Sequence, residues 1–265
     1  MNKLSHKVKV IVVFSVAAVM LFVGVFASVV YANHSWGGYH WARTSNPFTL
    51  KIGDNVSSKW DSYLDTASGD WSLSSVLDTI IVSGQNKASC RATNGRVEVC
   101  NKTYGRNGWL GVAQIWIDSS GHITQGTVKM NDTYFNTSTY NTPAWRNLVM
   151  CQEIGHTLGL DHQDEIFDNP NLGTCMDYTN DPSANQHPNQ HDYAQLEAIY
   201  THLDSTTILG STVLPKGKGN GVEVNLDDSS AWGKGLRKDS KGNNSLFGRD
   251  LGNGDKLFTF VIWAN

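Results

Sequence analysis

The sequence predicts an α+β domain, because strand-like and helix-like patterns follow one another along a chain of 265 residues. Alternation of apolar and polar residues predicts strands over residues 48–52, 79–82, 111–118, 123–130 and 257–263. Apolar residues at helical spacing predict helices over residues 57–67, 143–158 and 192–203. Nine tryptophans and 25 glycines fit β-rich structure with many tight turns.

Cap signals mark the starts of two of these helices. Thr142 followed by Pro143 is typical of a helix start, with a capping hydroxyl and then proline at the first helical position. Asp192 and Gln195 have the spacing of a capping box, which predicts that the last helix opens at Asp192. Its buried stripe would run from Tyr193 to about residue 203.

The N-terminal 32 residues are typical of a targeting segment. Three lysines precede an apolar run over residues 10–30, and cleavage after Ala32 fits the residues at that point. The run is also just long enough to span a bilayer, so residues 1–32 are either a signal peptide or an uncleaved anchor. Both alternatives place the rest of the chain outside, secreted or membrane-anchored. A net charge of -3 argues against nucleic acid as a partner.

Four cysteines fit an oxidising compartment. Asn94-Gly95 predicts a two-residue hairpin turn, and Cys90 and Cys100 flank it at nearly matched distances. We therefore expect a disulfide across this hairpin. The other two cysteines are Cys151 and Cys175.

The most informative stretch runs from residue 150 to 164, where a helix ends and the chain turns. Gln152 and His156 are four residues apart and lie on one helical face, with Glu153 beside them. Gly159 can adopt the left-handed conformation that ends a helix, so the chain can return His162 toward His156. Two imidazoles, a third polar group and a carboxylate would then converge, as a catalytic zinc site requires.

This segment resembles the metzincin signature His-Glu-x-x-His-x-x-Gly-x-x-His, which precedes a Met-turn. Glu153, His156, Gly159 and His162 match the signature, and Met176 within Cys-Met-Asp-Tyr matches the Met-turn. The resemblance implies a zinc metallopeptidase domain over residues 33–204. It also implies a twisted mixed sheet, an active-site helix, and a further helix after the Met-turn. Glu153 would act as general base on a zinc-activated water.

Gln152 departs from the signature, which has a histidine at this position. Three alternatives follow: Gln152 binds zinc weakly, another residue such as His187 or His191 replaces it, or the metal site is lost. By the same resemblance, a disulfide between Cys151 and Cys175 would hold the Met-turn beneath the metal.

Two functions remain open from the sequence. The first is an exported zinc endopeptidase, expected to be a monomer, and the second is a catalytically silent metzincin-like module that binds peptides or surfaces. By resemblance, the hairpin over residues 111–130 would provide the sheet edge that pairs with an extended polypeptide substrate. The remaining histidines are interpreted as surface, packing or turn residues; they include His34, His40 and His122. Residues 205–265 form a β-rich extension that the resemblance does not explain.

Overall fold

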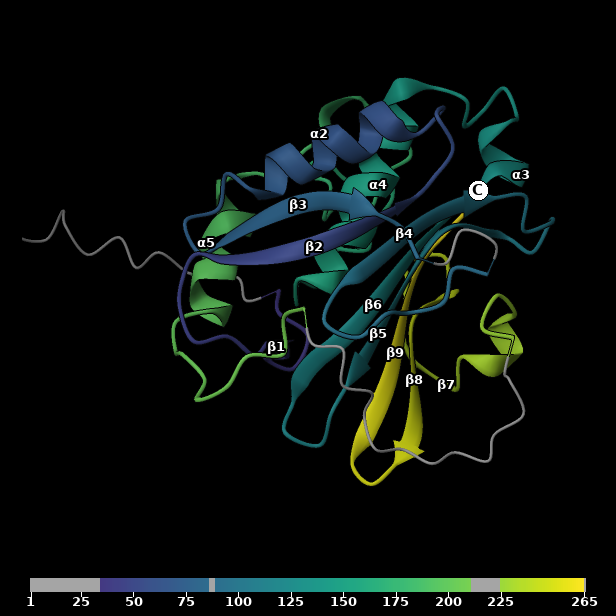
Figure 1. Cartoon of the computed structure of the whole chain (residues 1–265). Helices are drawn as coiled ribbons and strands as arrows, with labels where there is room; N and C mark the ends of the chain where they lie inside the picture. Colours follow the sequence, from purple (N-terminus) through teal and green to yellow (C-terminus); the bar gives the residue numbers. More distant parts are fainter. Residues whose placement is uncertain (1–33, 86–88, 211–224, 265) are drawn as a thin grey trace, which may run out of the picture. The chain divides into compact units, whose positions relative to one another are not determined.

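The computed structural model describes residues 34–85, 89–210 and 225–264, which belong to one compact unit beginning at Asn33. The proposed targeting segment, residues 1–32, lies outside the described residues. Within the described part of the chain, nine strands form a single sheet, in a mixed α/β arrangement (Figure 1). Across these same ranges, no helix is long and apolar enough to cross a membrane.

The sheet has the order β3-β2-β4-β6-β5-β9-β8-β7, and β1 pairs separately with the start of β6. The strands β3, β2, β4 and β6 are parallel to one another, and each later pair along the order, from β6–β5 to β8–β7, is antiparallel. Their bounds are β1 His40–Trp41, β2 Phe48–Asn55, β3 Leu77–Ser83, β4 Val97–Lys102, β5 Trp109–Ile117, β6 His122–Asn131, β7 Lys234–Lys238, β8 Asn244–Gly252 and β9 Asp255–Trp263.

Three longer helices and one short helix accompany the sheet. They are α2 Asp61–Trp71, α3 Asp132–Phe135, α4 Pro143–Thr157 and α5 Gln190–Ile199, with short 3-10 turns at Pro182–Ala184 and Ser229–Ala231. Helix α4 packs on β5 and β6, and α2 packs on α4 and β3 (Figure 1). The main hydrophobic core lies between these helices and the sheet. Almost every residue of α4 from Trp145 onward is buried, so this helix is the centre of the unit.

Most local predictions are confirmed, with small shifts at element ends. Thr142 caps α4 by accepting a hydrogen bond from the Trp145 amide, and Pro143 is the first helical residue. The predicted capping box is displaced, because Asn189 is the N-cap of α5 and Asp192 is its third residue. The helix predicted over residues 57–67 is observed four residues later, as α2.

The hairpin predicted at Asn94-Gly95 is wrong. Gly95 does adopt a positive φ of 74°, but the described residues between β3 and the turn, 84–85 and 89–93, form no strand, and β4 instead pairs in parallel with β2 and β6. The turn signal was local, whereas the pairing of β4 is made by strands far away in sequence. Both expected disulfides are nevertheless present, Cys90–Cys100 and Cys151–Cys175.

The C-terminal residues continue the sheet. Strand β9 pairs along the whole length of β5, and the turn at Asn253-Gly254, with both residues at positive φ, connects it to β8. In Figure 1 the yellow strand β9 lies directly beside β5, and β8 lies on the other side of β9. The hairpin of β5 and β6 therefore does not provide a free edge in this state, contrary to the expectation from the resemblance. We call β7, β8 and β9 together the β7–β9 extension.

Candidate metal centre

The end of α4 brings two histidines together through a glycine turn. His156 lies in the last turn of the helix, and Gly159 follows the C-cap with a φ of +100°. A side chain at this position would be strained, and its Cβ would lie 2.5 Å from the Tyr39 carbonyl oxygen. The turn lets the chain reverse, so that His162 meets His156 as the sequence predicted.

We expect Gly159→Val to disrupt this approach, with reduced metal binding at His156 and His162 and a lower melting temperature. Strain at positive φ costs about 1–3 kcal/mol, and the contact with the Tyr39 carbonyl adds to it. Gly173→Val is the matched control, because Gly173 has a φ of +72° but an added Cβ meets nothing within 4 Å. Equal effects of the two variants, measured by thermal unfolding and zinc titration, would show that the turn does not position His162.

The two imidazole rings face each other through their Nε2 atoms, which are 2.9 Å apart. On the other side of each ring, the Nδ1 atom of His156 lies 2.9 Å from the Leu160 carbonyl oxygen, and that of His162 lies 2.7 Å from Glu165 Oε1. A carbonyl or carboxylate oxygen only accepts, so both Nδ1 atoms must carry the proton. Each Nε2 atom therefore directs a lone pair at the other.

No proton is available to join these two lone pairs near neutral pH. Burial lowers the pKa of His162 to about 3. Burial, followed by the neighbouring His162 ring, also holds the pKa of His156 well below its usual range. Both rings are therefore neutral at pH 7, and a cation between them is the arrangement that satisfies both lone pairs.

Gln152 is placed to offer its oxygen rather than its nitrogen. Its Nε2 donates a 2.8 Å hydrogen bond to the Cys175 carbonyl oxygen, which fixes the orientation of the amide. Its Oε1 is buried and has no hydrogen-bond partner within the described residues. This is the orientation that an amide ligand needs, and it supports the first of the three alternatives for this position.

Glu153 is fully buried, and neither carboxylate oxygen has a hydrogen-bond partner in the part of the chain that the structure describes. Burial raises its pKa well above the ordinary value, and the nearby backbone of Ala113 offsets only part of this effect. The close approach of β5 encloses the carboxylate, since a Cβ at Gly111 would lie 2.7 Å from Glu153 Oε1. A buried carboxylate without a hydrogen-bond partner, three residues before His156 on α4, is typical of a functional site rather than of a stabilising interaction.

We expect Glu153→Gln to stabilise the metal-free protein, and to do so more at pH 8 than at pH 4. The folded pKa is raised, so the native state loses stability as pH rises above about 4.5, by up to about 1.4 kcal/mol per pH unit, whereas glutamine does not titrate. Glu98→Gln is the control, because Glu98 is equally buried but pairs with Arg96 at 2.9 Å and should lose stability. Thermal unfolding at pH 4 and pH 8 measures the stability of Glu153→Gln relative to the parent. A stabilisation that is smaller at pH 8 than at pH 4 would contradict this account.

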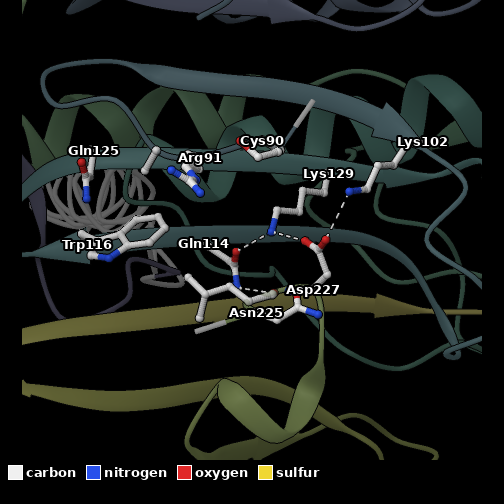
Figure 2. A pocket seen from close by; sticks show the side chains of 12 residues that line it. Cys90, Arg91, Lys102, Gln114, Trp116, Gln125, Lys129, Asn225 and Asp227 are labelled. Carbon is white, nitrogen blue, oxygen red and sulfur yellow. Dashed lines mark hydrogen bonds and ion pairs between the residues drawn. The ribbon is translucent and has the colours of Figure 1, made fainter. Parts of the chain in front are cut away.

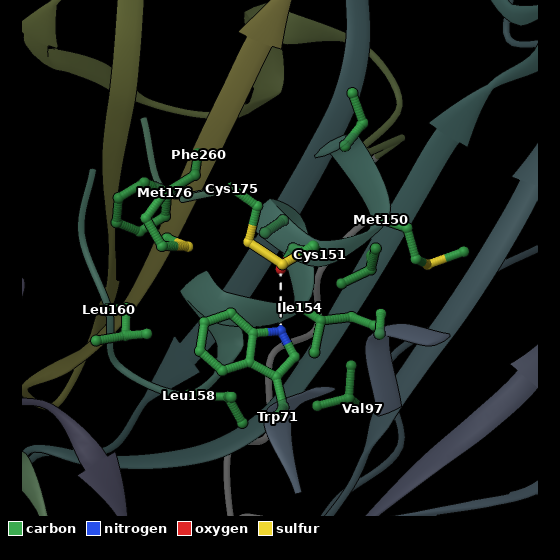
Figure 3. Close-up of a cluster of buried hydrophobic side chains, with 14 of the residues drawn as sticks. Trp71, Val97, Met150, Cys151, Ile154, Leu158, Leu160, Cys175, Met176 and Phe260 are labelled. Atoms are coloured by element: carbon green, nitrogen blue, oxygen red, sulfur yellow. Dashed lines mark hydrogen bonds between the residues drawn. A yellow bond between two sulfur atoms is a disulfide. The ribbon is translucent and has the colours of Figure 1, made fainter. Parts of the chain in front are cut away.

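The turn that carries Met176 packs against α4, where a Cβ at Gly155 would lie 2.5 Å from Met176 Sδ. Met176 is fully buried, and the Cys151–Cys175 disulfide ties the residue before it to the helix (Figure 3). The indole of Trp71 donates a 3.1 Å hydrogen bond to the Cys151 carbonyl oxygen. The floor of the site is thus cross-linked and densely packed.

The β7–β9 extension covers the His156–His162 pair. The ring of Phe260, on β9, stacks on His156 with centroids 4.0 Å apart and an interplanar angle of 12°. Tyr178 donates a 2.6 Å hydrogen bond to the Val261 carbonyl oxygen. On β7, Arg237 binds Asp161 through both terminal nitrogens, one contact at 2.6 Å, and its Nε lies 2.8 Å from Glu165. In this state His156 is completely buried and His162 is 6% exposed.

Other histidines lie elsewhere. His187 is exposed and pairs with Asp70 at 2.7 Å, and His191 stacks on His34. Neither is joined to the His156–His162 pair by a hydrogen bond or a ring contact, so neither takes the place of Gln152 in this structure.

The residues that close the site were not identified from the sequence. Glu165 follows His162 by three residues in a polar run, and this spacing could have suggested an outer partner for the imidazole. Arg237 and Phe260 carry no such signal, because they reach the site only through the pairing of β9 with β5.

A large cavity of about 570 Å³ lies away from the metal centre. Figure 2 shows its lining residues, with Lys129 between Gln114 and Asp227 at 3.0 and 2.7 Å. None of the candidate metal ligands lines it, so its size does not mark the site of the chemistry proposed below.

Comparison with known proteins gives distant structural similarity only. No protein-family model and no curated protein matches the chain. High choriolytic enzyme 1, a hatching-enzyme zinc-protease of medaka (Oryzias latipes), is 11% identical, with a TM-score of 0.37 over 63% of this chain and 96% of its own. A structure of myroilysin is 13% identical, with a TM-score of 0.35 over 60% of this chain and 82% of its own. Another myroilysin structure is 10% identical, with a TM-score of 0.35 over 66% and 97%.

Proposed function

We propose that this chain is an exported zinc-dependent endopeptidase whose β7–β9 extension holds the active site closed. The observation that supports this most strongly is the pair of imidazole lone pairs directed at each other across 2.9 Å. On the same helix, four and three residues before His156, Gln152 and Glu153 carry a buried amide oxygen and a buried carboxylate that have no hydrogen-bond partner among the described residues. This set of unsatisfied groups fits a zinc ion and a reacting water better than it fits a closed core.

The residues present fit zinc. His156, His162 and Gln152 would supply three ligands, two imidazole nitrogens and one amide oxygen, and would leave one tetrahedral position open as in catalytic sites. The hydrogen bonds from each Nδ1 to Leu160 and Glu165 would fix the ring orientations. The bound ion would supply Lewis-acid activation of a water molecule and of the scissile carbonyl.

Glu153 would act as the general base and then as the general acid. Its carboxylate, next to the ligand positions on α4, would take a proton from the attacking water and pass it to the leaving amine. The raised pKa of Glu153 in the metal-free protein reflects burial without a partner, and a nearby cation would favour the charged form. Glu153 binds no metal in this scheme, so its loss should stop turnover without releasing zinc.

The substrate would be a polypeptide in extended conformation. The antiparallel pairing of β9 with β5, with Phe260 opposite Ala113, supports this proposal, because it is the kind of pairing that an extended substrate would make. A substrate strand would make the same main-chain hydrogen bonds once β9 has left. The two disulfides fit an exported protein, secreted or anchored by residues 1–32.

The alternative, a catalytically silent binding module, is favoured by one observation. Phe260 covers the ring of His156, and β9 occupies the position on β5 where a substrate would lie. If the extension never leaves, zinc would have only a structural role here. The two functions agree on zinc binding and differ on hydrolysis.

The test combines zinc content with hydrolysis of a reduced and alkylated, unfolded protein. We expect His156→Ala to lose a zinc ion relative to the parent, and Glu153→Gln to keep that ion while losing cleavage. Cleavage that persists in Glu153→Gln would overturn the assigned role of the glutamate. A zinc content unaffected by His156→Ala would overturn the metal centre itself.

A further inference from the structure

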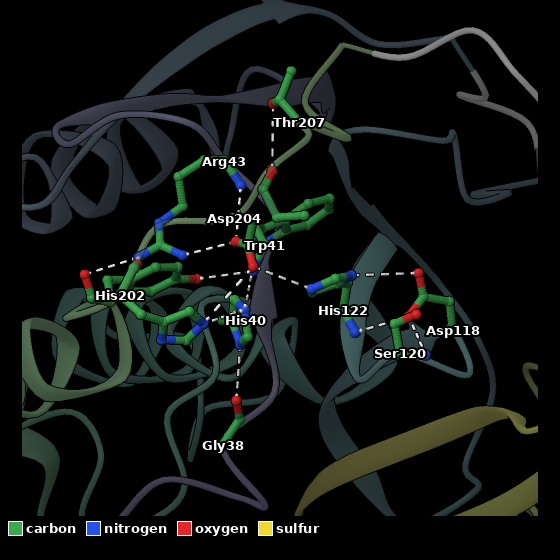
Figure 4. Close-up of polar contacts among 12 residues, drawn as sticks. Gly38, His40, Trp41, Arg43, Asp118, Ser120, His122, His202, Asp204 and Thr207 are labelled. Carbon is green, nitrogen blue, oxygen red and sulfur yellow. Dashed lines mark hydrogen bonds and ion pairs between the residues drawn. The ribbon is translucent and has the colours of Figure 1, made fainter.

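Three histidines and an aspartate, none of them a candidate ligand of the metal centre, meet at a second point. His40 belongs to β1 and His122 to the start of β6, where the two residues pair in register. The other two follow α5, within a short His-x-Asp segment, His202 and Asp204. Figure 4 shows all four side chains directed toward one another.

The distances between their polar atoms resemble those of a metal site. Asp204 Oδ1 lies 3.5 Å from His40 Nε2, 3.3 Å from His122 Nε2 and 3.8 Å from His202 Nε2. The Nε2 atoms of His40 and His202 are 3.1 Å apart. Ligands at about 2.0–2.1 Å around a tetrahedral zinc ion lie roughly 3.3 Å from one another, and these four spacings run on both sides of that value. The ligand atoms of His40, His122 and Asp204 all lie within 4.8 Å of one another, and His202 joins this group through His40 and Asp204.

Hydrogen bonds to groups outside the cluster orient the ligand atoms of His40 and Asp204 toward its centre. His40 Nδ1 lies 2.9 Å from the Gly38 carbonyl oxygen and must carry the proton there, which leaves the lone pair on Nε2. Asp204 Oδ2 accepts hydrogen bonds from the Arg43 amide and Nη1, at 3.2 and 3.0 Å, so Oδ1 remains for a ligand. The Asp118 carboxylate lies 3.7 Å from His122 Nδ1.

A hydrogen-bond cluster alone explains this arrangement less well. One contact in this group is an ordinary hydrogen bond, between the Nε2 atoms of His40 and His202 at 3.1 Å. The Asp204 carboxylate, however, lies 3.3 to 3.8 Å from all three imidazoles, which is longer than a close hydrogen bond of about 2.7–3.0 Å. It lies at comparable distances from each of them, which is the pattern expected around a central ion.

We propose that these four residues form a structural zinc site that no comparison assigns: His40, His122, His202 and Asp204. Three imidazoles and one carboxylate oxygen suit zinc, and all four positions come from the protein, which is typical of structural rather than catalytic sites. The proposal is independent of the peptidase function.

The ion would join the N-terminal segment to the segment after α5, behind the active-site helix. The neighbouring Trp41 indole donates a 2.8 Å hydrogen bond to the carbonyl oxygen of Thr157, the last residue of α4. The Tyr39 carbonyl oxygen closely approaches Gly159. Zinc at this second point would therefore stabilise the backbone that supports the turn to His162.

The test uses the full chain with both His156→Ala and His162→Ala, so that the metal centre contributes no zinc. We expect this protein to retain a single zinc ion after dialysis and to melt at a higher temperature with zinc than without. Adding His202→Ala or Asp204→Asn should weaken zinc binding at least about 100-fold and abolish the thermal shift. His187→Ala is the matched control, because the His187 side chain is 55% exposed and that of His202 is 56% exposed.

Circular dichroism checks that each variant is folded. Zinc retained in the control but lost in His202→Ala and Asp204→Asn would support the site. A folded background protein that binds no zinc would overturn the proposal. Undiminished binding after His202→Ala and Asp204→Asn would overturn it equally.

Discussion

Arg237→Ala should raise the rate at which the zinc-loaded protein cleaves an unfolded polypeptide by about tenfold. Arg237 joins the β7–β9 extension to Asp161 and Glu165, on either side of His162. The Arg237 side chain is 34% exposed, so solvent screens these ion pairs. We therefore expect Arg237→Ala to destabilise the closed state relative to the open state by about 1–2 kcal/mol. About 1.4 kcal/mol corresponds to a tenfold larger open fraction, and hydrolysis should follow that fraction.

Arg237 places a positive charge near His162, so its removal also changes zinc affinity. The parent and the variant are therefore compared at saturating zinc, where both are fully loaded with metal. Arg249→Ala is the matched control. Arg249 lies on β8 and donates to the Ala231 carbonyl oxygen at 3.0 Å, away from the metal centre. If both variants cleave at the parental rate, the extension does not act as a removable cover.

Gln152→His should raise zinc affinity at the metal centre by about 10–100-fold and increase hydrolysis in the Arg237→Ala background. An imidazole is a better zinc donor than an amide oxygen, and position 152 already lies four residues before His156 on the same face of α4. A change in a partner outside the ligand shell commonly alters affinity by about this factor, so a change of ligand should do at least as much.

Competition with a zinc-binding dye measures this affinity, with the His202→Ala substitution added to remove the second site. Gln186→His controls for an added histidine, because Gln186 lies outside the metal centre and donates to Ser183. An unchanged affinity in Gln152→His would mean that position 152 does not face the metal. The three alternatives for this position would then reduce to loss of the site or replacement of the ligand.

The sequence was informative where the structure depends on short-range patterns. The spacing of His156, Gly159 and His162 follows from one helix end and one glycine turn, and all three lie where the pattern placed them. The cap at Thr142 is equally local. Such features depend on backbone geometry over a few residues, which the amino-acid sequence encodes directly.

Long-range pairing could not be predicted in the same way. The strand pattern of β9 was evident, but nothing in it shows that β9 pairs with β5 rather than forming a separate layer. The same holds for the second cluster, where His40 and His122 were interpreted as packing and turn residues. Only the pairing of β1 with β6, and the return of the chain after α5, brings them to His202.

The central claim is that a zinc ion lies between His156 and His162, and anomalous diffraction at the zinc absorption edge tests it most directly. Crystals of the full chain grown with zinc should show a peak between the two Nε2 atoms, beside Gln152 Oε1 and beneath the ring of Phe260. An empty position there, with the two Nε2 atoms still 2.9 Å apart in crystals grown with excess zinc, would contradict the account.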